Sequence, residues 1–279
     1  MFKSVGLVAR FDKTNAVKLA KDLGKYLSSK GLAVYIEDTL AGKANLEGEL
    51  VPLNLMKTDF VITIGGDGTI LRASISLPKP EPPILPINMG VRGFLTEVEP
   101  SQTFDAIDKC LNNEFQIEKH MKLSVAAGNM KLPDALNEVM VSTDEPAKLL
   151  YAHLMKDDES IMKCQSDGLM VATPTGSTGY SLSAGGPVLD SDLDAFVLTP
   201  ICPLSVFHPI VFPANSRLNI KVERPKKSLV LIDGHHQRIL RSRLSNLAVT
   251  RSKHETFFIR FRANFYHRLR NRLLFKGVR

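Results

Sequence analysis

The chain has 279 residues, of which 44% are hydrophobic and 23% charged, and its formal net charge is +7 at pH 7. This length predicts one large domain or two modest ones, and the hydrophobic content excludes a disordered chain. No apolar run reaches the length of a membrane-spanning helix. The positive charge suits an anionic substrate or a loosely bound nucleic acid, so charge alone does not choose between them.

The amino terminus and the cysteines predict a cytoplasmic protein. The first ten residues are too short and too soon charged for a signal peptide, and they are typical of a first strand. Cys110, Cys164 and Cys202 are odd in number and lack C-x-x-C spacing. We therefore expect reduced thiols packed in the core.

The first third of the chain alternates short apolar runs with helical patterns, which predicts an α/β domain. The expected elements are strands at 5–9, 32–36, 60–64 and 84–87, and a helix at 15–30 that ends at Gly31. The dinucleotide fingerprint G-x-G-x-x-G does not follow the first of these strands. The usual dinucleotide-binding βαβ unit is therefore excluded there.

A glycine-rich turn, Gly65-Gly-Asp-Gly-Thr69, joins the third strand to a helix. Such a turn exposes backbone N–H groups and the positive end of a helix dipole, which favours phosphate binding at Gly65, Gly66, Gly68 and Thr69. We expect glycines because side chains would block close approach and because some of these positions need positive φ. Asp67 would repel a phosphate, so it is expected to accept a proton from a hydroxyl or to hold Mg²⁺. The alternative is a tight turn with Asp chosen for turn propensity alone.

A second glycine-bearing loop, at 88–94, follows the next strand at the same edge of the sheet. Its Phe94 is expected either to stack on a base or to lie in the core. After a helix at 99–112, apolar residues alternate with polar ones, as in half-buried strands. We therefore expect an α/β domain at 1–100, completed by 255–279, and a mainly β domain at 101–254.

Two stretches interrupt this β pattern. Asn137 and Glu138 lie between apolar neighbours, where a buried polar pair is costly without partners; the alternative is a strand-end pair that faces water. The stretch 165–187 holds glycine and hydroxyl residues at high density. We expect a strand that runs into a helix whose first turn is a ligand cradle.

The histidines and the end of the chain suggest less about function. The seven histidines have no metal-ligand spacing, and His235 is expected in an exposed turn from which it could reach a ligand. Phe265, Leu269 and Leu273 recur at helical spacing, which predicts an amphipathic helix docked on a domain. The arginines between them are expected to be solvated rather than to bind nucleic acid.

Together these motifs resemble the NAD kinase family. The matching segments, in the family's order, are Gly65–Thr69, Asn88–Phe94, Asn137–Glu138, Ser166–Pro187, Thr199–Pro203 and Ile232–Gly234. The first is also found in phosphofructokinases and lipid kinases, whereas Ser166–Pro187 is strongly specific. The resemblance implies an N-terminal α/β domain, a mainly β C-terminal domain, and a C-terminal helix that returns to the first.

The resemblance also implies an activity and its residues. ATP, with Mg²⁺ or another divalent cation, would phosphorylate the 2′-hydroxyl of the adenosine ribose of NAD to give NADP, and Asp67 would accept the proton. The residues implied in NAD binding are Gly68, Arg72, Phe94, Asn137, Glu138, Lys148, Gln165, Asp167, Thr178, Gly179, Tyr180, Ser181, Leu182, Ser183, Cys202 and His235. Lys148, Gln165 and Cys202 correspond by offset rather than by residue type. The family usually has Ala at the position of Gly179, so we expect a small change in packing there.

Alternatives remain open at this point. A lipid or sugar kinase would share the glycine-aspartate turn but would leave 166–187 unexplained. A nucleotide-sensing or nucleic-acid-binding module without catalysis is a third reading, which Asp67 in a phosphate turn disfavours. The family implies a homodimer or homotetramer that acts on NAD and ATP, without a nucleic-acid or membrane partner and without a metal site of its own. The sequence does not decide between ATP and polyphosphate as donor.

Overall fold

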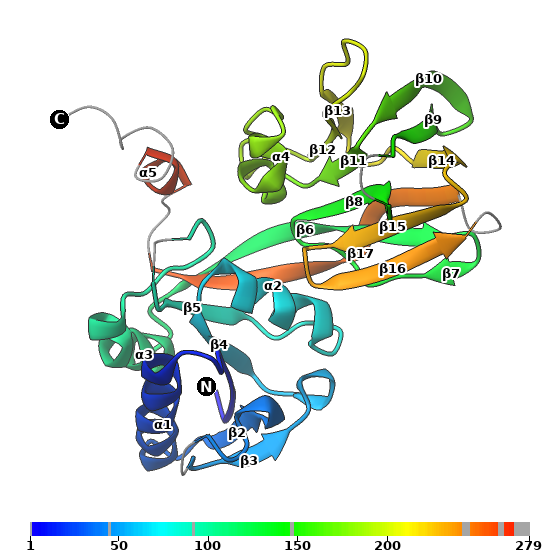
Figure 1. The fold of residues 1–279 in the computed structure, drawn as a ribbon. Helices are drawn as coiled ribbons and strands as arrows, with labels where there is room; N and C mark the ends of the chain where they lie inside the picture. Colours follow the sequence, from blue (N-terminus) through cyan, green and yellow to red (C-terminus); the bar gives the residue numbers. More distant parts are fainter. Residues whose placement is uncertain are drawn as a thin grey trace. The chain divides into compact units, whose positions relative to one another are not determined.

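The chain forms two compact units in a computed structural model (Figure 1). The structure describes residues 2–43, 46–90, 93–145, 148–241, 246–261 and 265–270. Residues up to His120, with those from Thr256 onward, make the first unit, and Met121–Glu255 make the second. The chain passes from one unit to the other within two long strands, β6 (Gln116–Ala127) and β17 (Asn246–Arg260).

The first unit is an α/β fold built on a parallel sheet. Its elements are β1 (Ser4–Ala9), α1 (Thr14–Ser29), β2 (Ala33–Glu37), η1 (Asp38–Leu40), β3 (Glu49–Val51), η2 (Leu53–Leu55), β4 (Phe60–Gly65), α2 (Asp67–Ser76), β5 (Ile84–Asn88), η3 (Pro100–Gln102), α3 (Thr103–Leu111) and α5 (Phe265–Leu269). The strand order is β3-β2-β1-β4-β5, with every pair parallel. The end of β17 joins this sheet beside β5, where Phe258 pairs with Ile84.

The core of the first unit lies between this sheet and two helices. Alternate strand residues, among them Val5, Leu7, Phe60 and Ile62, belong to one buried cluster, because successive side chains of a strand point to opposite faces. The helices α1 and α3 pack on that cluster and lie beside one another in Figure 1. The helix α2 contacts β4 and β1 outside the cluster.

The start of this unit follows the sequence pattern closely. In α1 the buried positions are Ala16, Val17, Ala20, Leu23, Gly24 and Leu27, which recur every three or four residues. Gly31 follows the helix with φ +82°, the left-handed conformation that glycine provides after a helix.

The helix α3 belongs to the first unit, since Ala106, Ile107 and Cys110 lie in its core. The division expected at residue 100 precedes this helix, and as an assignment of functional domains it stays a prediction.

The second unit is mainly β. Its further elements are β7 (Met130–Lys131), β8 (Glu138–Thr143), β9 (Leu150–Lys156), β10 (Glu159–Ser166), β11 (Gly168–Ala172), η4 (Gly176–Thr178), α4 (Tyr180–Ser183), β12 (Ala195–Ile201), β13 (Ile210–Pro213), β14 (Leu218–Arg224), β15 (Lys227–Ile232) and β16 (His236–Arg241). One sheet has the order β13-β12-β11-β8-β15-β16 and is antiparallel throughout. In the other sheet, the strands of this unit are adjacent in the order β10-β9-β14-β17.

The fold class predicted from the sequence is confirmed: an α/β unit, a mainly β unit and a final helix. The expected helix after 172 is wrong in its form. The chain makes a 3-10 turn, η4, and then α4, which is one helical turn long. Glycines and hydroxyl residues in this stretch favour turns over a continuous helix.

The cysteines are free, as expected, but only two of them are core residues. Cys110 and Cys164 are buried, whereas Cys202 is exposed, so its assignment as a packed thiol is wrong. Cys202 has φ +46° and lies in the loop that follows β12. Within the described residues, no helix combines the length and the apolarity that a membrane span requires.

Candidate active site

The glycine-rich turn joins β4 to α2, as the sequence predicts. Gly66 is the N-cap residue of α2 in an extended conformation, φ −111° and ψ −170°. Gly65, Gly66 and Gly68 are not among the glycines with positive φ, so that expectation is wrong. Close packing explains Gly65 instead, because a Cβ there would overlap the side chain of Thr69. Gly66 has open space at its Cβ position, and a ligand can approach its backbone.

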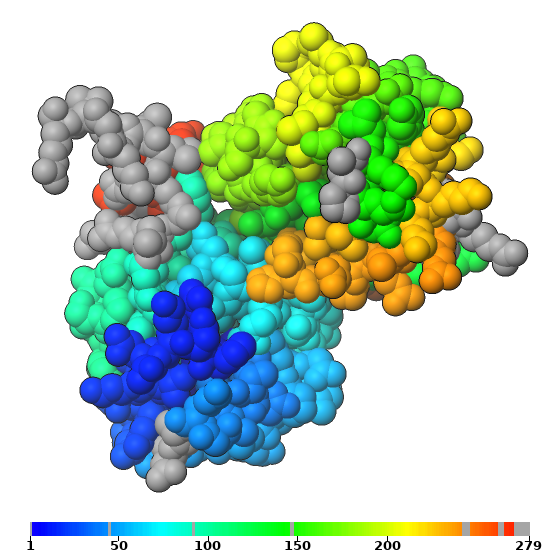
Figure 2. Space-filling model, in the orientation of Figure 1, coloured from blue at the N-terminus to red at the C-terminus, as the bar shows by residue number. Residues whose placement is uncertain are grey.

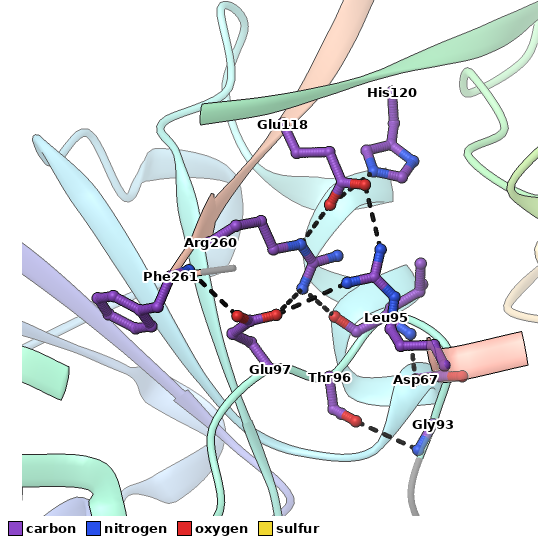
Figure 3. A network of polar contacts seen from close by, with 10 residues as sticks. Asp67, Gly93, Leu95, Thr96, Glu97, Glu118, His120, Arg260 and Phe261 are labelled. Atoms are coloured by element: carbon purple, nitrogen blue, oxygen red, sulfur yellow. Dashed lines mark hydrogen bonds and ion pairs between the residues drawn. The ribbon is translucent and has the colours of Figure 1, made fainter. Parts of the chain in front are cut away.

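Asp67 is the first residue of α2, and its carboxylate is held by the loop after β5 (Figure 3). Asp67 Oδ2 accepts the N–H of Phe94 at 2.9 Å, and Oδ1 accepts that of Leu95 at 3.2 Å. A Cβ on Gly93 would overlap Asp67 Oδ1, so a larger residue there would displace the carboxylate. A carboxylate has about four lone-pair sites, and two remain to accept a proton or a hydroxyl. This is an oriented proton acceptor at a helix N-terminus suited to phosphate.

Arg72 lies five residues further along α2, and its charge is balanced inside the first unit. Its two terminal nitrogens bind the carboxylate of Glu37, which is 1% exposed, with Nη2–Oε2 at 2.8 Å. A bidentate pair of this kind fixes the guanidinium in one geometry. The contact of Arg72 with NAD stays a prediction, and so does that of Phe94, which is half-buried.

In the second unit, one buried carboxylate holds the Asn137–Glu138 segment. Asp233 follows β15 and is 2% exposed. Its Oδ2 accepts the N–H of Leu136 at 2.7 Å, and its Oδ1 accepts those of Asn137 and Glu138 at 2.8 and 3.0 Å. These three bonds fix the backbone where the expected NAD-binding pair begins β8.

The electrostatics of this segment follow from burial. Burial raises the pKa of Asp233 to about 6, while its three N–H bonds and the charge of fully buried Lys122 act in the opposite direction. Burial, and then the charge of Asp233, raise the pKa of Glu138 to about 8. Glu138 Oε2 and Asn137 Oδ1 are buried and have no hydrogen-bond partner among the residues that the structure describes. Such atoms are expected where a ligand supplies the partner.

The turn that follows β11 is tied to the same segment. Thr173 Oγ1 donates to the carbonyl of Leu136 at 2.6 Å and accepts the N–H of Gly176 at 3.1 Å. A Cβ on Gly176 would overlap the carbonyl of Asn137, which explains that glycine. A Cβ on Gly179 would lie 3.6 Å from both Asn137 Nδ2 and Glu138 Oε2. The structure therefore brings Asn137, Glu138 and Gly179 together.

The other residues of this stretch differ in their exposure. Tyr180 and Ser183 are exposed, and Thr178 and Leu182 are half-buried. The hydroxyl of Ser181 is buried and shares a hydrogen bond of 2.9 Å with Thr199, so this side chain is used within the fold. A role of these residues in binding NAD stays a prediction.

Backbone pairing brings Gln165, Asp167 and Cys202 close to one another. The N–H of Asp167 donates to Ile201 O at 2.9 Å, and the N–H of Leu204 donates to Gln165 O at 2.8 Å. All three predicted residues are exposed. His235 is exposed in the turn between β15 and β16, as expected.

A cavity of about 1010 Å³ lies over β8, β15 and β16. Two predicted residues, Lys148 and Asp167, line it together with Asp144, Arg238 and Arg241. Lys148 also forms an ion pair with Glu145. In Figure 2 the green surface of β8 and the orange surface of β15 and β16 adjoin there, as their pairing requires. Asn137 and Glu138 do not line this cavity.

Three positioning residues were missed from the sequence: Glu37, Gly93 and Asp233. Glu37 and Asp233 both stand at the carboxyl end of a predicted strand, which is a weak signal for a functional carboxylate. Their partners are 35 and up to 97 residues away in the chain, so no local pattern indicates them.

Family models match both parts of the chain. The model described as the ATP-NAD kinase N-terminal domain matches residues 5–115, and that of the ATP-NAD kinase C-terminal domain matches residues 136–261. The NAD kinase of Methanothermobacter thermautotrophicus is 38% identical over 277 residues, which cover 98% of this chain and 97% of that protein.

Solved structures agree with this finding. The NAD kinase of Archaeoglobus fulgidus in complex with ATP superposes with a TM-score of 0.78 at 29% identity and covers 96% of each chain. The yeast NADH kinase complexed with NADH has a TM-score of 0.88 over 99% of this chain and 89% of that one. At 23% identity, this second likeness concerns the fold alone.

Proposed function

This chain belongs to the ATP-NAD kinase family, and we propose that it transfers the γ-phosphoryl group of ATP to the 2′-hydroxyl of the adenosine ribose of NAD, which yields NADP. The match extends over nearly the full length of the relatives that carry this name. A lipid or sugar kinase and a non-catalytic nucleotide-binding module are therefore not favoured.

The observation that carries the mechanism is the oriented carboxylate of Asp67 beside a turn suited to phosphate. Asp67 accepts the proton of the ribose 2′-hydroxyl while that oxygen bonds to the γ-phosphorus. The bond from this phosphorus to the β,γ-bridging oxygen breaks, and ADP leaves. Because phosphoryl transfer needs alignment and charge neutralisation, the turn's backbone N–H groups have as large a part as the base.

NAD is proposed to bind in the second unit with its adenosine near Asn137, Glu138 and Gly179. The two buried side-chain oxygens, which lack partners within the described part of the chain, support this placement, since ribose hydroxyls and the adenine amino group can donate to them. Asp167 is proposed for the nicotinamide end, and its position on the cavity over β8, β15 and β16 supports that.

A divalent cation is proposed to enter with ATP. The described residues include no group of three or more His, Cys, Asp or Glu side chains that could hold a metal ion. Mg²⁺ is commonly held by substrate phosphates, waters and one or two carboxylates, so these residues fit Mg²⁺ carried by the nucleotide. Its chemistry there would be neutralisation of phosphate charge.

A homodimer or homotetramer in the cytoplasm is proposed from the family resemblance. The free state of all three cysteines supports a reducing compartment. Light scattering of the purified chain measures its mass in solution and decides its oligomeric state.

The test is a coupled assay of the purified chain with NAD, ATP and Mg²⁺, in which an NADP-specific dehydrogenase detects the product. Asp67→Asn should lose about 10²–10⁴-fold in kcat, the usual worth of a general base, with nearly unchanged NAD affinity. Asp105→Asn is the matched control, because Asp105 is an exposed carboxylate on α3 paired with Lys109.

Each outcome of this assay decides one part of the proposal. Full activity of Asp67→Asn would remove the general-base role. NADP formed from polyphosphate but not from ATP would change the donor and leave the acceptor as proposed. No NADP from either donor, in a chain that still binds NAD, would leave a binding module.

A further inference from the structure

The backbone of the loop after β5 binds the Asp67 carboxylate, and a buried arginine, Arg260, contacts that loop (Figure 3). Arg260 is the last residue of β17 and is 2% exposed. Its Nη1 donates to the carbonyl of Leu95 at 2.8 Å, and the N–H of Leu95 donates to Asp67 Oδ1 at 3.2 Å. Leu95 is therefore held from both sides, by Arg260 and by the carboxylate of Asp67.

Two carboxylates fix the guanidinium of Arg260. Its Nε binds Glu118, and its Nη1 lies 3.3 Å from Glu97 Oε2. Glu97 also accepts the N–H of Phe261 at 3.1 Å. Rotation of the planar guanidinium would break several of these contacts at once, so it has one defined orientation.

A second arginine, Arg268 on α5, completes this group. Its Nη2 lies 3.1 Å from Glu118 Oε1, and its Nη1 lies 3.7 Å from Glu97 Oε2. Burial alone would raise the pKa of Glu118, but a hydrogen bond from His120 and the charges of Arg260 and Arg268 hold it well below its usual range. The group thus places two guanidinium groups against two carboxylates. Buried ion pairs add little net stability, so their defined geometry is the more informative property.

We propose that Arg260 is a positioning residue of the kinase reaction, which fixes Leu95 so that the N–H groups of Phe94 and Leu95 keep Asp67 oriented toward the ribose hydroxyl. This inference rests on the proposed function and adds a residue to its site. Asp67 is only half-buried, and these two N–H groups hold both of its oxygens. A shift of the base by about 1 Å can cost on the order of 10²-fold in rate, so the loop behind it matters.

The kinetic test compares four variants of the full chain in the NADP assay. Arg260→Gln should lower kcat about 10–100-fold, because the base is misplaced, and change KM for NAD by less than about 3-fold. Arg260→Lys should restore part of the lost kcat. An ammonium group can reach the Leu95 carbonyl or a carboxylate, but it cannot bridge them as the planar guanidinium does. Arg268→Gln should have a smaller effect than Arg260→Gln. Arg251→Gln is the control, since Arg251 lies on the same strand but pairs with Asp194 and Glu255.

A second readout does not depend on activity. Amide hydrogen exchange of Phe94 and Leu95 should become about 10-fold faster in Arg260→Gln, because the loop opens more often, and stay unchanged in Arg251→Gln. If the wild type forms no NADP, the proposed function fails, and this exchange still decides whether Arg260 holds the loop.

Two results would overturn the inference. One is wild-type kcat in a folded Arg260→Gln. The other is unchanged exchange at Phe94 and Leu95. If Arg260→Gln does not fold, Arg260→Lys and Arg268→Gln decide, and wild-type kcat in both rejects the positioning role.

Discussion

Replacement of Asp233 tests how the Asn137–Glu138 segment is held. An Asn side chain can keep the oxygen that accepts the N–H groups of Asn137 and Glu138, but its amide nitrogen must then face the N–H of Leu136. The bond from the Leu136 N–H is lost, and that N–H faces the amide N–H of the new Asn side chain. This change should lower the free energy of unfolding by about 1–3 kcal/mol. Asn also tolerates the φ of +50° at this position.

Asp233→Ala should be markedly worse than Asp233→Asn. It leaves all three buried N–H groups without their acceptor, so about 3–5 kcal/mol should be lost. The left-handed backbone adds roughly 1 kcal/mol of strain for Ala. The central values for the two variants thus differ by about 3 kcal/mol, a large part of a typical total of 5–15 kcal/mol.

The measurement is urea unfolding followed by circular dichroism, because the chain contains no tryptophan. Both variants should also raise KM for NAD more than they lower kcat, since the displaced residues are proposed NAD contacts. If both variants unfold within about 0.5 kcal/mol of wild type, a range typical of surface substitutions, Asp233 does not hold this segment.

Two further changes test the same site. Gly93→Ala places a methyl group against the Asp67 carboxylate, so it should lower kcat and reduce the free energy of unfolding by about 1–3 kcal/mol. Gly90→Ala, which has open space at its Cβ position, is the control in the same kinetic and thermal unfolding assays. Equal behaviour of the two variants would contradict the overlap at Gly93. Because the folded-state pKa of Glu138 is raised from 4.5 to about 8, its ionised form opposes folding and stability should fall as pH rises through that interval. The Tm of Glu138→Gln minus that of wild type should therefore increase from pH 5 to pH 8, and a constant difference would contradict the raised pKa.

Local patterns predicted the fold well because they act over short distances. The strand at 60–64, the glycine turn and the helix after it are encoded in consecutive residues, and so is the period of α1. The single helix expected after 172 was wrong, because turn-forming residues outweighed the apolar flanks. The positive φ expected at Gly65 was also wrong. Glycine is required there because a side chain would overlap Thr69.

The sequence predicted the glycine-rich turn that carries Asp67, but not the contacts that hold its side chain. Asp67 is recognisable as a carboxylate within a glycine-rich turn, whereas its backbone partners are 27 and 28 residues away. The carboxylate of Asp233 reaches a segment 95 to 97 residues before it. Such contacts depend on the three-dimensional fold, and no spacing along one sequence specifies them.

The order of residues along the chain has a consequence for synthesis. Arg260 follows Leu95 by 165 residues, so a ribosome completes the glycine turn, the loop and the whole second unit before it adds the arginine that fixes Leu95. Until then the carboxylates of Glu97 and Glu118 lack Arg260, and they also lack Arg268, which follows it. A nascent chain can therefore present Asp67 to nucleotides before the loop that binds it is fixed, and full turnover should begin only after Arg260 has been added.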